Sequence, residues 1–200
     1  MLLQGEVGTA MRIIIGISGA SGAILGYELL KTLRSHAPME LHLVITANAE
    51  KTIALETGLS LSDYWALADF THDNHDMAAI ISSGSFVTDG MVVIPCSMKT
   101  LAAITHGYTT NLLTRAADVC QKENRRVVLV PREMPLNKVH LRNMEQAADD
   151  GYVIIPPMMT FYNQADSVQK QIDHIIGKIM LQFGLESNSF IPWQEPLSSA

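Results

Sequence analysis

The chain has 200 residues, of which 48% are hydrophobic and 17% are charged, a composition typical of one well-filled globular domain. Its net charge of -6 leaves no long basic stripe, which disfavours nucleic acid as a partner. The two cysteines, Cys96 and Cys120, lack metal-binding spacing and are too few for a disulfide framework, so we expect free thiols in a reducing compartment.

The beginning of the chain does not resemble a targeting segment. Residues 1–10 lack the basic start and the continuous apolar run of a signal peptide, and we expect them to form an N-terminal extension before Met11. No run reaches the ~18 apolar residues that a membrane span requires. These features predict a soluble, cytoplasmic protein with no membrane span.

Short β-branched runs alternate with longer helical patterns, which is typical of βαβ units and of a parallel sheet covered by helices on both faces. The pattern predicts a single-domain, three-layer α/β/α fold with a doubly wound, Rossmann-like parallel sheet. We expect strands near residues 12–17, 41–46, 91–94, 127–130 and 152–155, with a short sixth strand around 68–71. We expect helices near residues 22–35, 47–57, 60–68, 98–106, 110–122, 137–149 and 167–183, and we expect Gly107, Gly151 and Gly184 to end helices.

The first predicted strand runs into a turn of small residues, Gly16-Ile17-Ser18-Gly19-Ala20-Ser21-Gly22. Its glycine spacing differs from the dinucleotide pattern G-x-G-x-x-G, and no Asp or Glu ends the second strand to hold the ribose of NAD. Glycines permit close backbone approach, and the hydroxyls of Ser18 and Ser21 beside a helix N-terminus suit a phosphate. The turn therefore favours a flavin mononucleotide over a dinucleotide, although an ordinary strand-to-helix turn with serine caps is the alternative.

Polar residues also follow two later strands. Ser97-Met98-Lys99-Thr100 comes after the third strong strand and is expected to cap the next helix. The Arg132-Glu133 pair follows the fourth, after a proline, where paired charges suit both an anion and a proton transfer. Because the carboxyl ends of parallel strands line one edge of a sheet, these residues predict one phosphate-binding cleft.

Two other polar groups have simpler explanations. Arg115 and Lys122 are seven residues apart on one helix face, and a solvated basic face is at least as good an interpretation as a binding site. His72 and His75, with Asp73 and Asp76, are better explained as a solvated loop than as metal ligands. We assign no metal to this chain.

A set of short motifs occurs in order along residues 11–195. They are Gly19-Ala20-Ser21-Gly22, Pro95-Cys96-Ser97-Met98-Lys99-Thr100-Leu101, Arg115-Ala116-Ala117-Asp118, Pro131-Arg132-Glu133-Met134-Pro135-Leu136, His140-Leu141, Asn143-Met144 and Phe161-Tyr162. In this ordered set the chain resembles the UbiX/Pad1 flavin prenyltransferases, and most of all bacterial UbiX. The resemblance implies a metal-independent enzyme that joins the dimethylallyl group of dimethylallyl phosphate to N5 and C6 of reduced FMN. The prenylated FMN would serve a UbiD-type decarboxylase in ubiquinone biosynthesis or in phenolic-acid decarboxylation.

The resemblance also implies roles for individual residues. FMN would be held by Gly19, Ala20, Ser21, Thr46, Ser97, Met98, Lys99, Thr100 and Arg132. The substrate phosphate would be bound by Arg115, Lys122, Arg132, Tyr162 and Lys178. Glu133 would move the proton released on ring closure with the help of Ser21 and Glu56, and Trp193 would face the isoprenyl group. Residues 11–185 would form the flavin-binding domain of a homododecamer, and the tail 186–200 would contribute to a neighbouring site.

The chain departs from the family pattern at two positions. Lys178 stands where several members have Arg, and a lysine contacts phosphate as a point charge without a planar fork. Asp76 stands where some members have Trp, so any cation-π contact with an isoprenyl cation would depend on Trp193.

Other functions on the same fold are weighed against this one. A flavin-dependent cysteine decarboxylase usually carries an Asn-containing motif where this chain has Pro95–Thr100, and a catalytic His in its first half. A non-catalytic FMN carrier would need none of the charged residues named above. Direct phenylacrylic acid decarboxylation is less well supported, because the only evident electron sink is a flavin that must first be modified.

Overall fold

The computed structural model describes residues 10–36, 38–187 and 189–193. Within these residues, six parallel strands form one sheet in the order β3-β2-β1-β4-β5-β6. The strands are β1 (Met11–Ile17), β2 (Met39–Ile45), β3 (Phe70–His72), β4 (Gly90–Cys96), β5 (Arg126–Pro131) and β6 (Val153–Ile154). The order reverses between β1 and β4, which is the switch point where doubly wound sheets bind ligands.

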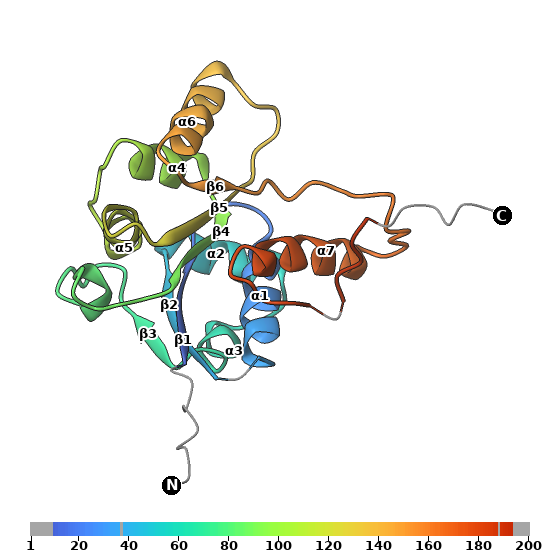
Figure 1. The fold of residues 1–200 in the computed structure, drawn as a ribbon, viewed down its shortest axis with the longest axis horizontal. Helices are drawn as coiled ribbons and strands as arrows, with labels where there is room; N and C mark the ends of the chain where they lie inside the picture. The colour runs from blue at the N-terminus through green and yellow to red at the C-terminus, as the bar shows by residue number, and fades with distance from the viewer. Residues whose placement is uncertain (1–9, 37, 188, 194–200) are drawn as a thin grey trace, which may run out of the picture.

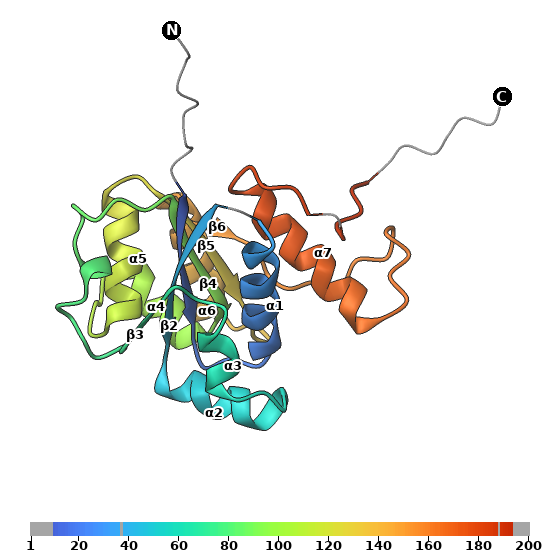
Figure 2. The same ribbon diagram turned by 90° about the horizontal axis from the view of Figure 1, so that it is seen from below.

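Helices cover both faces of the sheet, as the views in Figures 1 and 2 show: α1 and α7 lie on one face, and α4, α5 and α6 lie on the other. The helices are α1 (Ala23–Arg34), α2 (Ala47–Glu56), α3 (Leu61–Trp65), α4 (Met98–Thr105), α5 (Leu112–Lys122), α6 (Lys138–Asp149) and α7 (Val168–Leu181), with a short 3-10 helix η1 (Ile80–Ser82). The predicted three-layer, doubly wound fold is confirmed.

The central strands are apolar on both sides because each side meets a helical layer. Ile13 and Ile15 of β1 pack toward α1 and α7, whereas Ile14 packs toward α4 and α5. All three side chains are buried, and each contributes roughly 1.5–3 kcal/mol by leaving water. This double burial explains why the strands appear in the sequence as continuous apolar runs without alternation.

The predicted boundaries hold for the long elements and fail for some short ones. Gly107, Gly151 and Gly184 adopt left-handed backbone angles after helices, as expected of helix-ending glycines. The segment from Thr71 onward is not all loop, because Thr71 and His72 pair with β2 in the edge strand β3. In the described part of the chain, none of the helices is long and apolar enough to cross a membrane.

Candidate functional site

The carboxyl ends of β1, β2, β4 and β5 are joined by hydrogen bonds along one edge of the sheet. The Ser97 amide donates to Ser18 Oγ over 2.8 Å, and Ser18 Oγ donates to the Pro95 carbonyl over 3.0 Å. The Thr46 amide donates to Ile17 O, and the Arg132 amide donates to Cys96 O. These bonds hold the segments that follow the four strands next to one another, and so fix the backbone around the predicted cleft.

The Ser18 side chain is one of the groups that hold these strand ends together. Its side chain is 1% exposed, and its hydroxyl both donates to Pro95 and accepts from Ser97. A hydroxyl engaged in this way has little capacity left for a ligand. The expectation that the Ser18 hydroxyl contacts a bound anion is therefore wrong, because the residue joins β1 to β4.

Two helices begin at this edge with side-chain caps. Thr46 caps α2 by accepting from the Ala49 amide, and Ser97 caps α4 by accepting from the Thr100 amide over 3.2 Å. The predicted cap at Ser97 is confirmed. The remaining free amides of the first turns, together with the helix dipoles, favour an anion beside these two starts.

Gly19 permits the close approach of the first turn to α2. A Cβ placed on Gly19 would lie 2.5 Å from Cβ of Asn48, a separation that packed side chains do not tolerate. Beside it, the Gly22 amide donates to the Glu56 carboxylate over 2.8 Å, so the last residue of α2 holds the start of α1. The first turn therefore depends on the missing Cβ of Gly19 and on the hydrogen bond to the Glu56 carboxylate.

A cleft of about 700 Å³ lies against this edge. Its walls include several residues expected to hold FMN, namely Gly19, Thr46, Ser97, Lys99 and Thr100. Ala20, Ser21, Met98 and Arg132 belong to the same turns but do not line this cleft, and Met98 packs partly against the core under α4. The structure therefore brings together in one cavity the first part of the predicted flavin site.

Sequence reasoning missed the opposite wall of the cleft. It is formed by Asn74 and His75 after β3 and by a segment after α4 that includes His106, Tyr108 and Asn111. Asn74 is buried, and it accepts from the Leu112 amide through its carbonyl and from the Leu113 amide through its side chain. The available signal was position alone, since Asn74 and His75 follow a strand that ends at the same edge.

Arg132 and Glu133 follow β5 at this edge, and both are exposed. The Glu133 carboxylate accepts from the Met134 amide over 3.0 Å. Both side chains extend from a strand end whose backbone is fixed by the bond to Cys96. An exposed guanidinium next to an exposed carboxylate fits an open site that binds an anion and exchanges a proton.

The cations expected to bind the substrate phosphate are not gathered within one chain. Arg115 on α5 donates to Ser82 O over 3.2 Å and pairs with Asp118 over 2.6 Å. Lys122 ends α5, pairs with Glu123 and lies against the loop that precedes β4. Because α5 runs back toward the amino ends of the strands, Lys122 lies at the sheet edge opposite to Arg132. A phosphate contact shared by both residues does not form within this single chain.

Tyr162 and Lys178 lie on the α7 side of the molecule. The Tyr162 ring meets the His174 ring edge-on at 5.6 Å between centroids, and meets the Trp193 ring edge-on at 5.3 Å. The Lys178 ammonium lies 5.3 Å from the centroid of the Phe190 ring. Burial, and to a lesser extent Lys178, lower the pKa of His174 from its ordinary value. Tyr162 thus contacts Trp193, and Lys178 contacts the Phe190 ring on the same side of the molecule, while the roles expected of these residues stay predictions.

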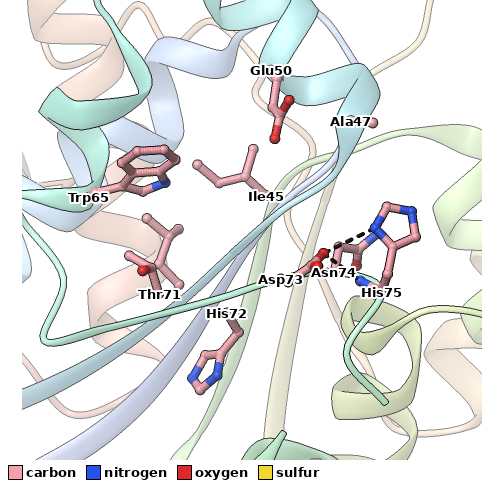
Figure 3. Close-up of a pocket in the computed structure, with 10 residues that line it drawn as sticks. Ile45, Ala47, Glu50, Trp65, Thr71, His72, Asp73, Asn74 and His75 are labelled. Atoms are coloured by element: carbon pink, nitrogen blue, oxygen red, sulfur yellow. Dashed lines mark hydrogen bonds and ion pairs between the residues drawn. The ribbon is translucent and has the colours of Figure 1, made fainter. Parts of the chain in front are cut away.

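A second, smaller cleft of about 390 Å³ adjoins the first at Ala47, Asn74 and His75 (Figure 3). The His75 ring bonds to the Asp73 carboxylate, with 3.0 Å between Nδ1 and Oδ1. Figure 3 shows this bond as a dashed line and the His72 ring directed away from Trp65 and Glu50. His72 bonds instead to the buried His42, with 2.9 Å between ring nitrogens. In the chain as described, no three His, Cys, Asp or Glu side chains converge as metal ligands.

Known proteins resemble this chain over almost its whole length. The Flavoprotein family model matches residues 5–183. A probable UbiX-like flavin prenyltransferase from Sedimentibacter hydroxybenzoicus is 61% identical over 92% of this chain and 97% of the relative. Flavin prenyltransferase UbiX from Escherichia coli strain K12 is 52% identical over 92% of this chain and 98% of the relative.

Solved structures give the same result. AnUbiX in complex with FMN and dimethylallyl pyrophosphate superposes with a TM-score of 0.91 at 47% identity, covering 94% of this chain and 99% of that chain. A dodecameric FMN-dependent UbiX-like decarboxylase from Escherichia coli O157:H7 gives 0.91 at 51% identity, covering 92% and 100%. The FMN-dependent cysteine decarboxylase TvaF gives 0.61 at 18% identity, covering 73% and 90%, which shows a common fold alone.

Proposed function

The chain belongs to the UbiX-like flavin prenyltransferases, and on this premise we propose how its residues join a dimethylallyl group to reduced FMN. The enzyme is a prenyltransferase with FMN as the acceptor. The observation that carries the assignment is the carboxyl-edge cleft, whose walls contain the residues that the sequence predicts for FMN. The cysteine decarboxylase alternative is less well supported, since the likeness to TvaF extends to the fold alone.

The first turn and the two helix starts fit the phosphate of FMN. Gly19 leaves room that a side chain would fill, and the caps at Thr46 and Ser97 leave first-turn amides free beside it. We propose that Gly19, Ala20, Ser21, Thr46, Ser97, Met98, Lys99, Thr100 and Arg132 hold the cofactor. Reduced FMN supplies the two nucleophilic atoms, N5 and C6, that accept the dimethylallyl group.

The substrate phosphate is the leaving group, and cations must stabilise the charge that it gains. The bond between the allylic carbon and the phosphate oxygen breaks, and the electron pair leaves with the phosphate. Arg132, Tyr162 and Lys178 are proposed to bind it, because donors placed where charge develops lower the barrier most. Trp193 is proposed to face the isoprenyl group, with which its ring can make a cation-π contact.

Arg115 and Lys122 complete this phosphate site from another subunit in our proposal. Within one chain Lys122 lies at the opposite edge of the sheet from Arg132, yet a similar protein of known structure is dodecameric. Packing the α5 end of one subunit against the carboxyl edge of the next would add two cations to the phosphate. The assembly, which we expect to be a homododecamer, is therefore part of the mechanism.

Glu133 is proposed to take the proton released when the new ring closes. It is an exposed carboxylate at a strand end beside Arg132, and it can pass the proton to the leaving phosphate or to water. Ser21 and Glu56 are proposed to assist. The bond from the Gly22 amide to Glu56 shows what this carboxylate does in the structure, which is to hold the turn that carries Ser21.

Other parts of the proposal concern organisation and partners. Residues 11–185 form the flavin-binding domain, and the prenylated FMN passes to a UbiD-type decarboxylase in the cytoplasm. The proposed N-terminal extension, residues 1–10, lies outside the described residues except for Ala10, as do residues 188 and 194–200 of the tail 186–200.

An anaerobic assay tests the proposed function. The purified protein is mixed with dithionite-reduced FMN and with either dimethylallyl phosphate or dimethylallyl pyrophosphate. The mass of the extracted flavin is then determined by mass spectrometry. We expect a flavin heavier by one isoprenyl unit, and much less of it from Glu133→Gln. Tightly bound but unmodified FMN from the wild-type protein would overturn the proposal and direct attention to cysteine substrates.

A further inference from the structure

His174 lies on α7 between two segments that are distant in sequence. Its ring packs edge-on against Tyr162, which belongs to the segment that precedes α7. On its other side it packs against the Phe190 ring, tilted by 30° at 5.1 Å between centroids. Tyr162 in turn contacts Trp193. One side chain thus connects the segment before α7 to the segment that follows it.

The polar atoms of the His174 imidazole make few favourable interactions at this location. The side chain is 5% exposed, and among the described residues its Nδ1 is buried with no hydrogen-bond partner. Leaving a buried polar atom unpaired lowers stability, a cost that an apolar ring of similar shape would avoid. The contribution of His174 to the protein is therefore the packing of its ring against both segments.

Phe190 is seated by a glycine of the same helix. Gly177 lies three residues after His174, so both residues are on one face of α7. A Cβ on Gly177 would collide with the Phe190 ring. Glycine destabilises a helix relative to alanine, so the space for the Phe190 ring is kept at a cost to the stability of α7.

We propose that His174 is a positioning residue of the substrate site, fixing Tyr162 directly and Trp193 through Tyr162 and Phe190. The inference rests on the proposed function, in which Tyr162 binds the substrate phosphate and Trp193 faces the isoprenyl group. Neither segment belongs to the sheet, so the position of both rings depends on contacts with α7. Gln171 of α7 bonds to the backbone of Thr160 in the first segment, and His174 is the residue that packs against the Tyr162 ring itself. An error of about 1 Å in such placement can cost up to a hundredfold in rate.

The charges around His174 make the positioning sensitive to pH. Lys178 lies one turn further along α7, and the Tyr162 phenol faces the imidazole from the other segment. A protonated ring would place a second cation near Lys178 and would bury a charge among aromatic side chains. We expect the ring to work in its neutral form and the positioning to weaken in acid.

Matched variants test the proposal through the KM for dimethylallyl phosphate. His174→Phe keeps the ring packing and is expected to stay within about twofold of the wild type, whereas His174→Ala should raise KM about tenfold. FMN affinity should not change in either variant. Equal KM values for the alanine variant and the wild type, or an equal loss in both variants, would overturn the proposal.

Gly177→Ala provides a second test that removes no buried side chain. It should raise the KM while helix stability is kept, because the added methyl displaces Phe190. In a Trp65→Phe background, the emission of Trp193 should shift to the red in Gly177→Ala and in His174→Ala. An unshifted emission with unchanged KM in both variants would contradict the positioning role.

The pH profile separates this role from a structural one. Because burial lowers the pKa of His174 from its ordinary value, the KM of the wild type should rise only in acid, below the pH at which a free histidine titrates, and that of His174→Phe should rise less. Superimposable profiles would rule out the pH sensitivity that the charges predict. If the wild-type protein forms no prenylated flavin at all, it is the proposed function that fails, since the comparison among variants requires an active parent enzyme.

Discussion

The flavin half and the substrate half of the candidate site are built in different ways. The flavin half is made within one chain from turns that follow neighbouring strands, and its backbone is held by Ser18, Thr46 and Ser97. The substrate half draws on the strand end at Arg132, on the aromatic cluster beside α7 and on α5, whose Lys122 lies at the opposite edge. In our proposal the flavin half lies within one protomer, whereas the substrate half also needs a neighbouring subunit.

This contrast explains why the two halves differ in what a mutation should do. A change in the flavin half acts within its own subunit and should lower cofactor affinity. A change in α5 should impair the site of a neighbouring subunit and leave cofactor binding intact. Experiments that mix subunits, or that repair a contact within one chain, can therefore test whether the two halves differ in this way.

The largest expected effect is the restoration of activity when two inactive variants are mixed. Lys122→Ala and Glu133→Gln should each lower prenylation about a hundredfold or more, since each removes a charge that acts on the reaction. If different subunits supply these residues, co-expressed oligomers should regain activity in about a quarter of their sites. The rate of flavin prenylation per subunit measures the effect.

The control for this experiment is the double variant Lys122→Ala/Glu133→Gln co-expressed with the wild type. In that case random assembly also leaves about a quarter of the shared sites intact, whereas sites made by one subunit would remain intact in half of them. Mixed single variants with no more activity than either alone would show that one chain supplies both residues, and the comparison between the halves would fail.

The second prediction concerns the flavin half, where Gly19→Ala should lower FMN affinity about tenfold or more. The added methyl meets Cβ of Asn48 and must push the first turn away from α2. Equilibrium titration of the protein with FMN measures the affinity. Asn48→Gly removes the atom that is struck first, so Gly19→Ala should do less harm in that background. An equal loss in both backgrounds would contradict the steric explanation.

The fold, and the strand ends that line the cleft, can be predicted from the sequence for physical reasons. Strands buried on both faces leave continuous apolar runs, and caps such as Ser97 stand beside the amides that they accept from. Both signals are local in sequence. The Ser18 hydroxyl was misjudged because its partner, Pro95, is distant in sequence and becomes adjacent only when β4 pairs with β1.

The other half of the site escapes prediction from residue patterns for a related reason. Nothing in the spacing of Arg115 and Lys122 distinguishes a solvated helix face from a contact with another subunit, and only the resemblance to a family suggested a role. The cleft wall at Asn74 and His75 was missed because a three-residue edge strand leaves a weak pattern. The packing of His174 against Tyr162 and Phe190 depends on tertiary contacts of irregular segments.

A smaller effect is expected from the cap of α4. Ser97→Ala removes the bond from the Thr100 amide and should lower the free energy of unfolding by about 1 kcal/mol. Urea unfolding followed by circular dichroism measures the loss. Ser83→Ala, in an exposed loop, serves as the control and should change stability little. Because Ser97 is also proposed to hold FMN, the variant should bind FMN more weakly than the wild type, so its stability deficit should be larger at saturating FMN than without FMN. A deficit that does not grow with FMN would contradict that placement.

The smallest expected effect is a loss of stability in mild acid that involves one histidine from each half. Burial lowers the pKa of both His72, beside the flavin cleft, and His174, beside Tyr162, from the ordinary value of 6.5. His42 lowers the pKa of His72 further and Asp76 opposes the shift, whereas Lys178 lowers that of His174. The unfolded chain therefore binds more protons than the folded chain just below pH 6.5, so stability is full above that value and falls as the pH decreases.

Urea unfolding between pH 8 and about pH 5.5 should show the decline. His174→Phe should reduce its slope, and His72→Gln should reduce it independently, because the two residues share no contact. A slope that is unchanged in the double variant would assign the acid sensitivity to other groups and would remove the one property that we expect both halves to share.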